Sequence, residues 1–332
     1  MDYSQILSQQ FNIKEEYAKN IITLLDDGNT IPFIARYRKE MHGSMDDQLI
    51  REFAEKLEYL RGLDKRRDEI RSLIDAQEKL TDEINLALDK AATLSELEDI
   101  YRPYRPKRKT RASIAKEKGL EPLANDILKQ EKGFDPSKSA VDYIDEEKGV
   151  TSVEDAIQGA MDIIAELVSD NAEIRKRIRN LTNANGVLVS VATDEEKDSV
   201  YKNYYDYKEP VKKIAGHRVL AVNRGEKEGF LKVSVETDSE KPLNSIFRAM
   251  ITDKNQLCSD IIREACTDAY QRLIYPSIER EVRNDLTDTA AENAMKVFAV
   301  NLKQLLMQPP VKGKTVLALD PGYLSLIHIS EP

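Results

Sequence analysis

The chain has 332 residues and a net charge of −9, with 33% charged and 41% apolar residues, which is enough for about two domains with cores of their own. Its apolar runs are far shorter than the roughly 18 residues that cross a bilayer, and its start, MDYSQILSQQ, lacks the basic and apolar regions of a secretory signal. Two cysteines and three histidines are too few for a disulfide framework or a zinc module, so we expect a cytoplasmic protein with no membrane segment, no metal and no cofactor.

The first third of the chain shows the spacing of amphipathic helices. Apolar residues recur at steps of three and four, as they do along one face of a helix. Ser44 and Asp47 have the spacing of a capping box ahead of the longest of these repeats. Thr81 and Thr93 are also suited to cap helices. Together these signals predict five helices, which cover residues 13–25, 31–34, 47–74, 84–88 and 94–100.

The rest of the chain combines helices with a few strands. Apolar spacing predicts helices over 113–118, 121–131, 137–145, 153–181 and 255–308. The last of these is a very long helix, kinked or broken near Pro276. β-branched runs bounded by turn residues predict strands over 186–192, 230–236 and 314–320. The expected fold class is therefore mainly α: a multi-helix array with a very long central helix and a few short β-strands.

One segment concentrates positive charge. Six basic residues and no acid lie within ten positions, namely Arg102, Arg105, Lys107, Arg108, Lys109 and Arg111. We call Arg102–Arg111 the basic segment. Guanidinium groups grip phosphates with paired hydrogen bonds, and Tyr101 and Tyr104 offer rings on which bases stack. The same pattern fits arginines that pair with acidic helices and pack their stems over the tyrosine rings. The spacing leaves both interpretations open.

A second, shorter cluster of basic residues follows the predicted helix at 31–34. It contains Arg36, Arg38 and Lys39. Cations at the carboxyl end of a helix complement its dipole, and this structural interpretation is the better supported one here. We keep the three residues as weaker candidates for phosphate contact.

Asp320 is the one carboxylate in a position typical of catalysis. It ends the predicted strand 314–320 and precedes Pro321 and Gly322. RNase H-like enzymes place the first ligand of a two-metal site at such a strand end, but they need three or four converging acids. Only twelve residues follow Asp320, too few to complete the sheet. We therefore expect no catalysis from Asp320.

Four stretches of the chain resemble one known family. They are IPFIARYRKE (31–40), LEDIYRPYRPKRKTRASIAKEKGLEPLA (97–124), GHRVLAVNRGEKEG (216–229) and VLALDPG (316–322). This combination resembles the Tex family of bacterial transcription accessory proteins over essentially the whole chain to Gly322. The resemblance implies a helical N-terminal region ahead of a YqgF (RNase H-like) domain, helix-hairpin-helix modules and an OB-fold that binds RNA. It also implies that Asp320 matches the first acid of the RNase H-like motif.

The resemblance ends after Gly322, where the family continues into an Arg-Thr-Gly turn. Here residues 323–332 read YLSLIHISEP, of which the last eight are similar to translated sequencing adaptor. We therefore expect a gene product truncated at the first strand of the RNase H-like domain. The expected parts are a Tex-like helical region (1–195), a small β and helix-turn-helix-like insert with the long central helix (196–310), that first strand (311–322) and a non-native tail (323–332).

Three functions remain as hypotheses. The leading one is a non-enzymatic transcription accessory factor that contacts RNA or DNA, with the basic segment as the phosphate contact. The alternative is a protein-interaction scaffold that docks on the transcription machinery, or on the domains that the resemblance implies after Gly322, without touching nucleic acid. Its support is that the rest of the chain is acidic and that the apolar stripes of the long helix need cover. The remote alternative is an RNase H-like nuclease remnant built on Asp320.

Overall fold

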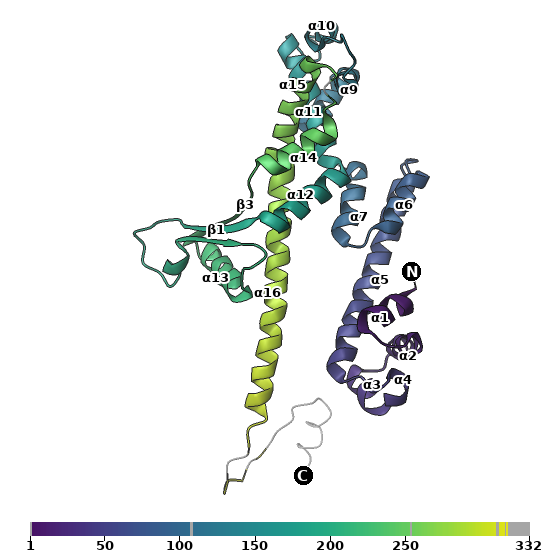
Figure 1. Ribbon diagram of the computed structural model, residues 1–332, viewed down its shortest axis with the longest axis vertical. Helices are drawn as coiled ribbons and strands as arrows, with labels where there is room; N and C mark the ends of the chain where they lie inside the picture. Colours follow the sequence, from purple (N-terminus) through teal and green to yellow (C-terminus); the bar gives the residue numbers. More distant parts are fainter. Residues whose placement is uncertain (1, 107–108, 253, 310–311, 316, 318–332) are drawn as a thin grey trace, which may run out of the picture. The chain divides into compact units, whose positions relative to one another are not determined.

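The computed structural model describes residues 2–106, 109–252, 254–309, 312–315 and 317 (Figure 1). The fold is mainly α with one small sheet, as the sequence predicts. The chain forms two compact units. The first comprises the described residues of Met1–Val187, Pro210–Lys212 and Val235–Val282, and the second those of Leu188–Glu209, Lys213–Ser234 and Arg283–Pro332. The domain boundaries expected at 195 and 310 stay predictions.

The amino-terminal part of the first unit is organised along one long helix. Its helices are α1 (Tyr3–Phe11), α2 (Glu15–Asp26), α3 (Ile31–Tyr37), α4 (Lys39–His42), α5 (Asp47–Asp75), α6 (Asp82–Lys90) and α7 (Leu94–Tyr101). Two apolar clusters follow α5. The first half of α5, with Phe53 at its centre, packs against α1, α2 and α3. The second half, with Ile70 buried, packs against α6 and α7.

The start of α5 differs from the predicted capping box. The side chain of Asp46, not Ser44, accepts a hydrogen bond from the backbone N–H of Leu49 at 2.7 Å. Ser44 has a φ of 62°, in the left-handed region that terminates helices, and it follows Gly43 at the end of α4. The caps predicted at Thr81 and Thr93 are confirmed.

The remaining helices of the first unit pack around α11 (Val153–Asp170), which contacts α8, α9 and α15 (Figure 1). They are η1 (Arg102–Tyr104), α8 (Arg111–Glu117), α9 (Glu121–Lys129), α10 (Pro136–Ala140), η2 (Val141–Tyr143), α12 (Ala172–Asn185), α14 (Glu240–Met250), α15 (Gln256–Asp268) and η4 (Ala269–Ile274). At Gly159 of α11 an added Cβ would lie 2.3 Å from Cδ1 of Leu120. Glycine therefore permits the close approach of the segment that leads into α9.

The single helix predicted over 153–181 is wrong, because the helix stops at Asp170 and restarts at Ala172. Asn171 has an extended backbone, and its side chain accepts from the N–H of Ile174 at 3.0 Å. Asparagine is a strong helix cap, so it starts α12 in a new direction without glycine or proline. The helix predicted over 137–145 is likewise shorter, since α10 ends at Ala140 and a 3₁₀ turn follows.

The long helical run predicted over 255–308 is confirmed in large part. It consists of α15, a π-helical stretch η4 and α16 (Tyr275–Leu306). Pro276 is the second residue of α16 and follows η4 directly, where the N–H of Tyr275 donates to the carbonyl of Tyr270. The irregular turn therefore lies just before the proline, in the π stretch, where the backbone hydrogen bonds change register.

The second unit carries most of the sheet. Strands β1 (Val187–Ala192), β2 (Asp206–Pro210) and β3 (Leu231–Glu236) are antiparallel in the order β2-β1-β3, with η3 (Lys202–Tyr204) and α13 (Gly216–Lys227) beside them. Leu188, Val222 and Leu231 form the centre of its core. Strands β1 and β3 were predicted, whereas β2 was not. The predicted strand 314–320 falls largely outside the described residues. No described helix is both long and apolar enough to span a bilayer.

Candidate nucleic-acid interface

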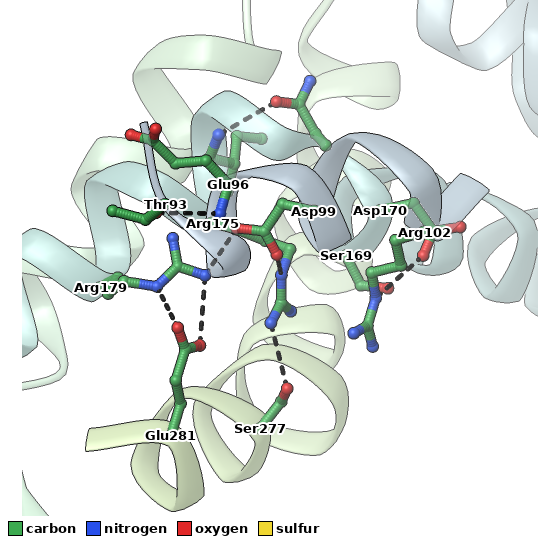
Figure 2. Close-up of polar contacts among 12 residues, drawn as sticks. Thr93, Glu96, Asp99, Arg102, Ser169, Asp170, Arg175, Arg179, Ser277 and Glu281 are labelled. Atoms are coloured by element: carbon green, nitrogen blue, oxygen red, sulfur yellow. Dashed lines mark hydrogen bonds and ion pairs between the residues drawn. The ribbon is translucent and has the colours of Figure 1, made fainter. Parts of the chain in front are cut away.

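A buried ionic cluster joins α7, α12 and α16 within the first unit. Asp99 of α7 is 5% exposed and receives hydrogen bonds from two arginines of α12. Arg175 donates from Nε to Oδ1 of Asp99 at 2.5 Å, and Arg179 donates from Nη2 to Oδ2 at 2.6 Å. Arg179 also donates from Nε to Glu281 of α16 at 2.6 Å, and Arg175 from Nη2 to Ser277 at 3.1 Å. Figure 2 shows that the guanidinium groups bridge α7 and α16.

Helical spacing explains why these side chains meet. Arg175 and Arg179 are four residues apart on α12, and Ser277 and Glu281 are four apart on α16, so each pair shares one face of its helix. The carboxylates of Asp99 and Glu281 both form ion pairs with these arginines, which offsets the free-energy cost of removing the charges from water. This cluster is not evident in the sequence, because the partners of Asp99 lie 76 and 80 positions along the chain. The only local signal was the four-residue spacing of the two arginines.

The basic segment begins directly at this cluster. Arg102 follows α7 in the 3₁₀ turn η1, and its Nε lies 3.3 Å from Oδ1 of Asp170 at the end of α11. Burial lowers the pKa of Arg102 from its ordinary value, and the nearby guanidinium of Arg175 acts in the same direction. Arg102 is therefore a half-buried cation held between an acid and another cation.

The segment is fixed at both ends. Near its start, Gln77 donates from Nε2 to the carbonyl of Tyr104 at 2.9 Å. At its end, Thr110 and Ser113 form a reciprocal capping box at the start of α8, with N···O distances of 3.0 and 2.8 Å. A basic loop with anchored ends loses less conformational freedom on binding than a free chain would.

The other basic residues of the segment differ in exposure and pairing. Arg105 is exposed, and no described residue forms an ion pair with it. Lys109 lies 4.0 Å from Glu117, with both side chains well exposed, so this pair is weak and hydrated. Arg111 is exposed at the first position of α8. Burial raises the pKa of Asp162, and the positive charge of Arg111 acts in the opposite direction. Lys107 and Arg108 lie outside the described residues.

Of the two interpretations left open for the tyrosines, the structure supports the packed one at Tyr101. Tyr101 is 6% exposed and belongs to the apolar cluster around the second half of α5. The guanidinium of Arg66 lies over its ring, 5.7 Å from the centroid. Tyr104 is partly buried against the same cluster. Tyr101 therefore anchors the start of the basic segment in the core, as expected if the tyrosine rings pack against the stems of arginines.

The second basic cluster lies on α3 and α4, which pack beside the first half of α5. Arg36 is exposed in the last turn of α3, the guanidinium of Arg38 lies 5.3 Å from the Phe33 ring centroid, and Lys39 is exposed at the start of α4. Helix α3 packs on the first half of α5, whereas α7 packs on the second half. The structure therefore does not bring this cluster to the basic segment.

Asp320, the carboxylate in a position typical of catalysis, lies outside the described residues. No group of three or more His, Cys, Asp or Glu within the described part of the chain is arranged to hold a metal ion. Cys258 and Cys266 are free and buried on α15, as expected for small core residues.

The fold and the basic segment together define a mainly helical protein with an anchored cationic surface. Comparison with known families identifies it further. The Tex-like protein N-terminal domain matches residues 1–75, and the Tex central region-like family matches residues 131–298. The chain belongs to the Tex family, as its sequence motifs indicate.

Several curated relatives align over 97% of the chain. Protein YdcI of Bacillus subtilis is 44% identical and the transcriptional accessory protein Tex of Neisseria gonorrhoeae is 36% identical. The human S1 RNA-binding domain-containing protein 1 is 32% identical. The aligned part is 46%, 43% and 34% of these relatives. The chain thus spans less than half the length of each.

Proposed function

We propose that this chain acts as a non-enzymatic transcription accessory factor that contacts the phosphate backbone of RNA or DNA through the basic segment. Two relatives support the setting, since one is named a transcriptional accessory protein and another an S1 RNA-binding domain-containing protein. The observation that carries the proposal is the exposure of Arg105, Lys109 and Arg111 on a segment without acids whose ends are anchored.

Electrostatics favours this segment over the rest of the surface. The net charge of the chain is −9, so most of the surface repels a polyanion. Interactions between exposed charges fade beyond about 8–10 Å at physiological salt. A local cluster of cations therefore decides whether a phosphate backbone binds, whatever the charge of the distant surface.

Binding of fluorescently labelled single-stranded RNA and DNA tests the proposal. Replacing Lys107, Arg108, Lys109 and Arg111 by alanine should weaken binding at low salt by at least tenfold. The matched control removes four exposed lysines of the same unit that lie outside the segment, namely Lys129, Lys132, Lys138 and Lys148. Equal losses in both variants would show that net charge, not the segment, governs binding.

A second function is favoured by one specific feature. The last turns of α16 expose large apolar side chains, among them Phe298, 66% exposed, and Leu305, 61% exposed. Contiguous exposed apolar surface of this kind marks protein contacts. The alternative proposal is a scaffold that docks on the transcription machinery through α16. If Phe298→Asp and Leu305→Asp abolish binding to purified RNA polymerase and the wild-type chain shows no affinity for nucleic acid at low salt, this function replaces the first.

A further inference from the structure

We propose that Arg102, Arg105 and Arg175 form a pocket that binds a single phosphate group. A cavity of about 200 Å³ opens where the basic segment leaves α7, and four arginines line it. They are Arg102, Arg105, Arg175 and Arg179, which come from η1, the loop after it and α12. The cavity is smaller than the ~300–1,000 Å³ of sites for drug-sized ligands, which suits a small anion.

A buried nitrogen atom points to a missing partner. Arg175 is 2% exposed, and its Nε and Nη2 are occupied by Asp99 and Ser277. Its Nη1 is buried and has no hydrogen-bond partner among the described residues. A guanidinium N–H that is removed from water without an acceptor is unfavourable, so a ligand oxygen at this position stabilises it.

Arg102 brings a second cation toward the same space. Its Nε faces Asp170, and Figure 2 shows its two terminal nitrogens turned away from that carboxylate. The guanidinium groups of Arg102, Arg175 and Arg179 all lie on the side of α7 that faces α16 in this view. Arg102 and Arg175 repel each other. An anion bound between the two guanidinium groups would attract both of them and so offset their mutual repulsion.

The carboxylates that line the cavity are already engaged. Asp99 accepts from Arg175 and Arg179, and Glu281 accepts from Arg179. Glu98 accepts from Nε of Arg66 on α5 at 2.7 Å. Arg105, at the rim, has no ion-pair partner among the described residues. The charge left over in the cavity is therefore positive, and guanidinium groups hold phosphate oxygens with paired hydrogen bonds.

The ligand class is a phosphate group, either carried by a nucleic acid or free in solution. The first source rests on the proposed function, because Arg102 and Arg105 belong to the basic segment. In that case the pocket fixes one phosphate of the strand while the exposed lysines and arginines follow the neighbouring ones. A free phosphate would use the same nitrogens.

Titration of the chain with inorganic phosphate, followed by calorimetry at constant ionic strength, tests the pocket. Arg105→Ala should weaken phosphate binding at least tenfold, and Arg102→Gln should do the same. The matched control is Arg177→Ala, because Arg177 lies on α12 next to the pocket arginines but is exposed and does not line the cavity. Arg105 is itself exposed, so its variant keeps the fold, which circular dichroism verifies.

Failure of the pocket is distinguishable from failure of the proposed function. Unchanged affinity in both pocket variants, or an equal loss in Arg177→Ala, would overturn the pocket even if oligonucleotides bind. If inorganic phosphate competes with an oligonucleotide, the phosphate group in the pocket belongs to a nucleic acid. If a 5′-phosphorylated strand also binds more tightly than its 5′-hydroxyl counterpart, that group is the phosphate at the strand end. Phosphate binding without any oligonucleotide binding supports the pocket and overturns the proposed function.

Discussion

Asp99 and Arg175 form a buried ion pair across 76 positions of the chain, with 2.5 Å between Oδ1 and Nε. The carboxylate of Asp99 also accepts a hydrogen bond from Nη2 of Arg179. Because Asp99 lies on the helix that leads into the basic segment, this pair fixes the position from which the segment starts. The stability of the helical scaffold and the placement of its cations therefore depend on the same carboxylate.

Asp99→Asn should destabilise the protein strongly. The substitution leaves the guanidinium of Arg175 buried without its counter-charge, and breaking a buried pair in this way costs about 3–5 kcal/mol. Urea unfolding measures the loss. The control is Asp68→Asn, which breaks the exposed pair with Arg71 on α5 and should cost less than about 1 kcal/mol. Similar losses in the two variants would mean that the Asp99 cluster is not a stabilising contact.

Glu96 should give the protein a pH-dependent contribution to stability. Hydrogen bonds from Lys176 and from the N–H of Ala92, both at 2.8 Å, hold the pKa of Glu96 below its ordinary value of 4.5. A lowered carboxyl pKa means that this contribution is complete above the ordinary value and is lost as the pH falls through the lowered one. Glu96→Gln should therefore cost about 1 kcal/mol at neutral pH and almost nothing in strong acid. A loss that stays constant across this range would contradict the assignment.

The two cysteines should be chemically silent in the folded protein. Burial raises the pKa of Cys266 to about 12, and burial also raises the pKa of Cys258. The thiolate is the reactive form, so neither thiol should react with Ellman's reagent near neutral pH until the protein unfolds. The expected result is that both thiols react with the reagent in urea and that neither reacts in the native protein. Fast reaction of either one in the native state would show that α15 opens locally.

Gly159→Ala should destabilise the packing of α11 although alanine favours helices. The new Cβ would lie 2.3 Å from Cδ1 of Leu120, which is 1% exposed and has little room to move. Overpacking of this kind costs about 1–3 kcal/mol. Adding Leu120→Ala removes the clashing methyl, so the double variant should lose less stability than the sum of the two single variants. Additive losses measured by thermal unfolding would exclude the contact as the cause.

The long elements of the fold are predictable from the sequence, because one apolar face determines each of them. Helix α5 follows its apolar stripe from Ile50 to Ile74, and strand β3 buries Leu231, Val233 and Val235 by simple alternation. Strand β2 has the sequence DYKEP and exposes every second residue, so nothing in its composition marks a strand. Strand β2 forms because the tertiary structure places its backbone beside β1, and this placement is not encoded in its local sequence.

The candidate site could be predicted only in part. A run of cations is visible in any window of the sequence, so Arg102, Arg105 and Lys109 are found at once. The exposure of Arg105 and the burial of Arg102 are not visible there, because burial depends on α11 and α12. Tyr101 shows the same limit, since a tyrosine between arginines has one pattern whether its ring faces solvent or the core.

The central claim is that the cations of the basic segment contact phosphates, and the salt dependence of oligonucleotide binding tests it most directly. The slope of log K against log salt concentration reports the number of phosphates neutralised, at about 0.9 for each contact on duplex DNA and about 0.7 on single strands. Replacing Lys107, Arg108, Lys109 and Arg111 by alanine should flatten this slope by two or more contacts, whereas the four-lysine control should leave it unchanged. An identical slope in the wild-type chain and the segment variant would contradict the account.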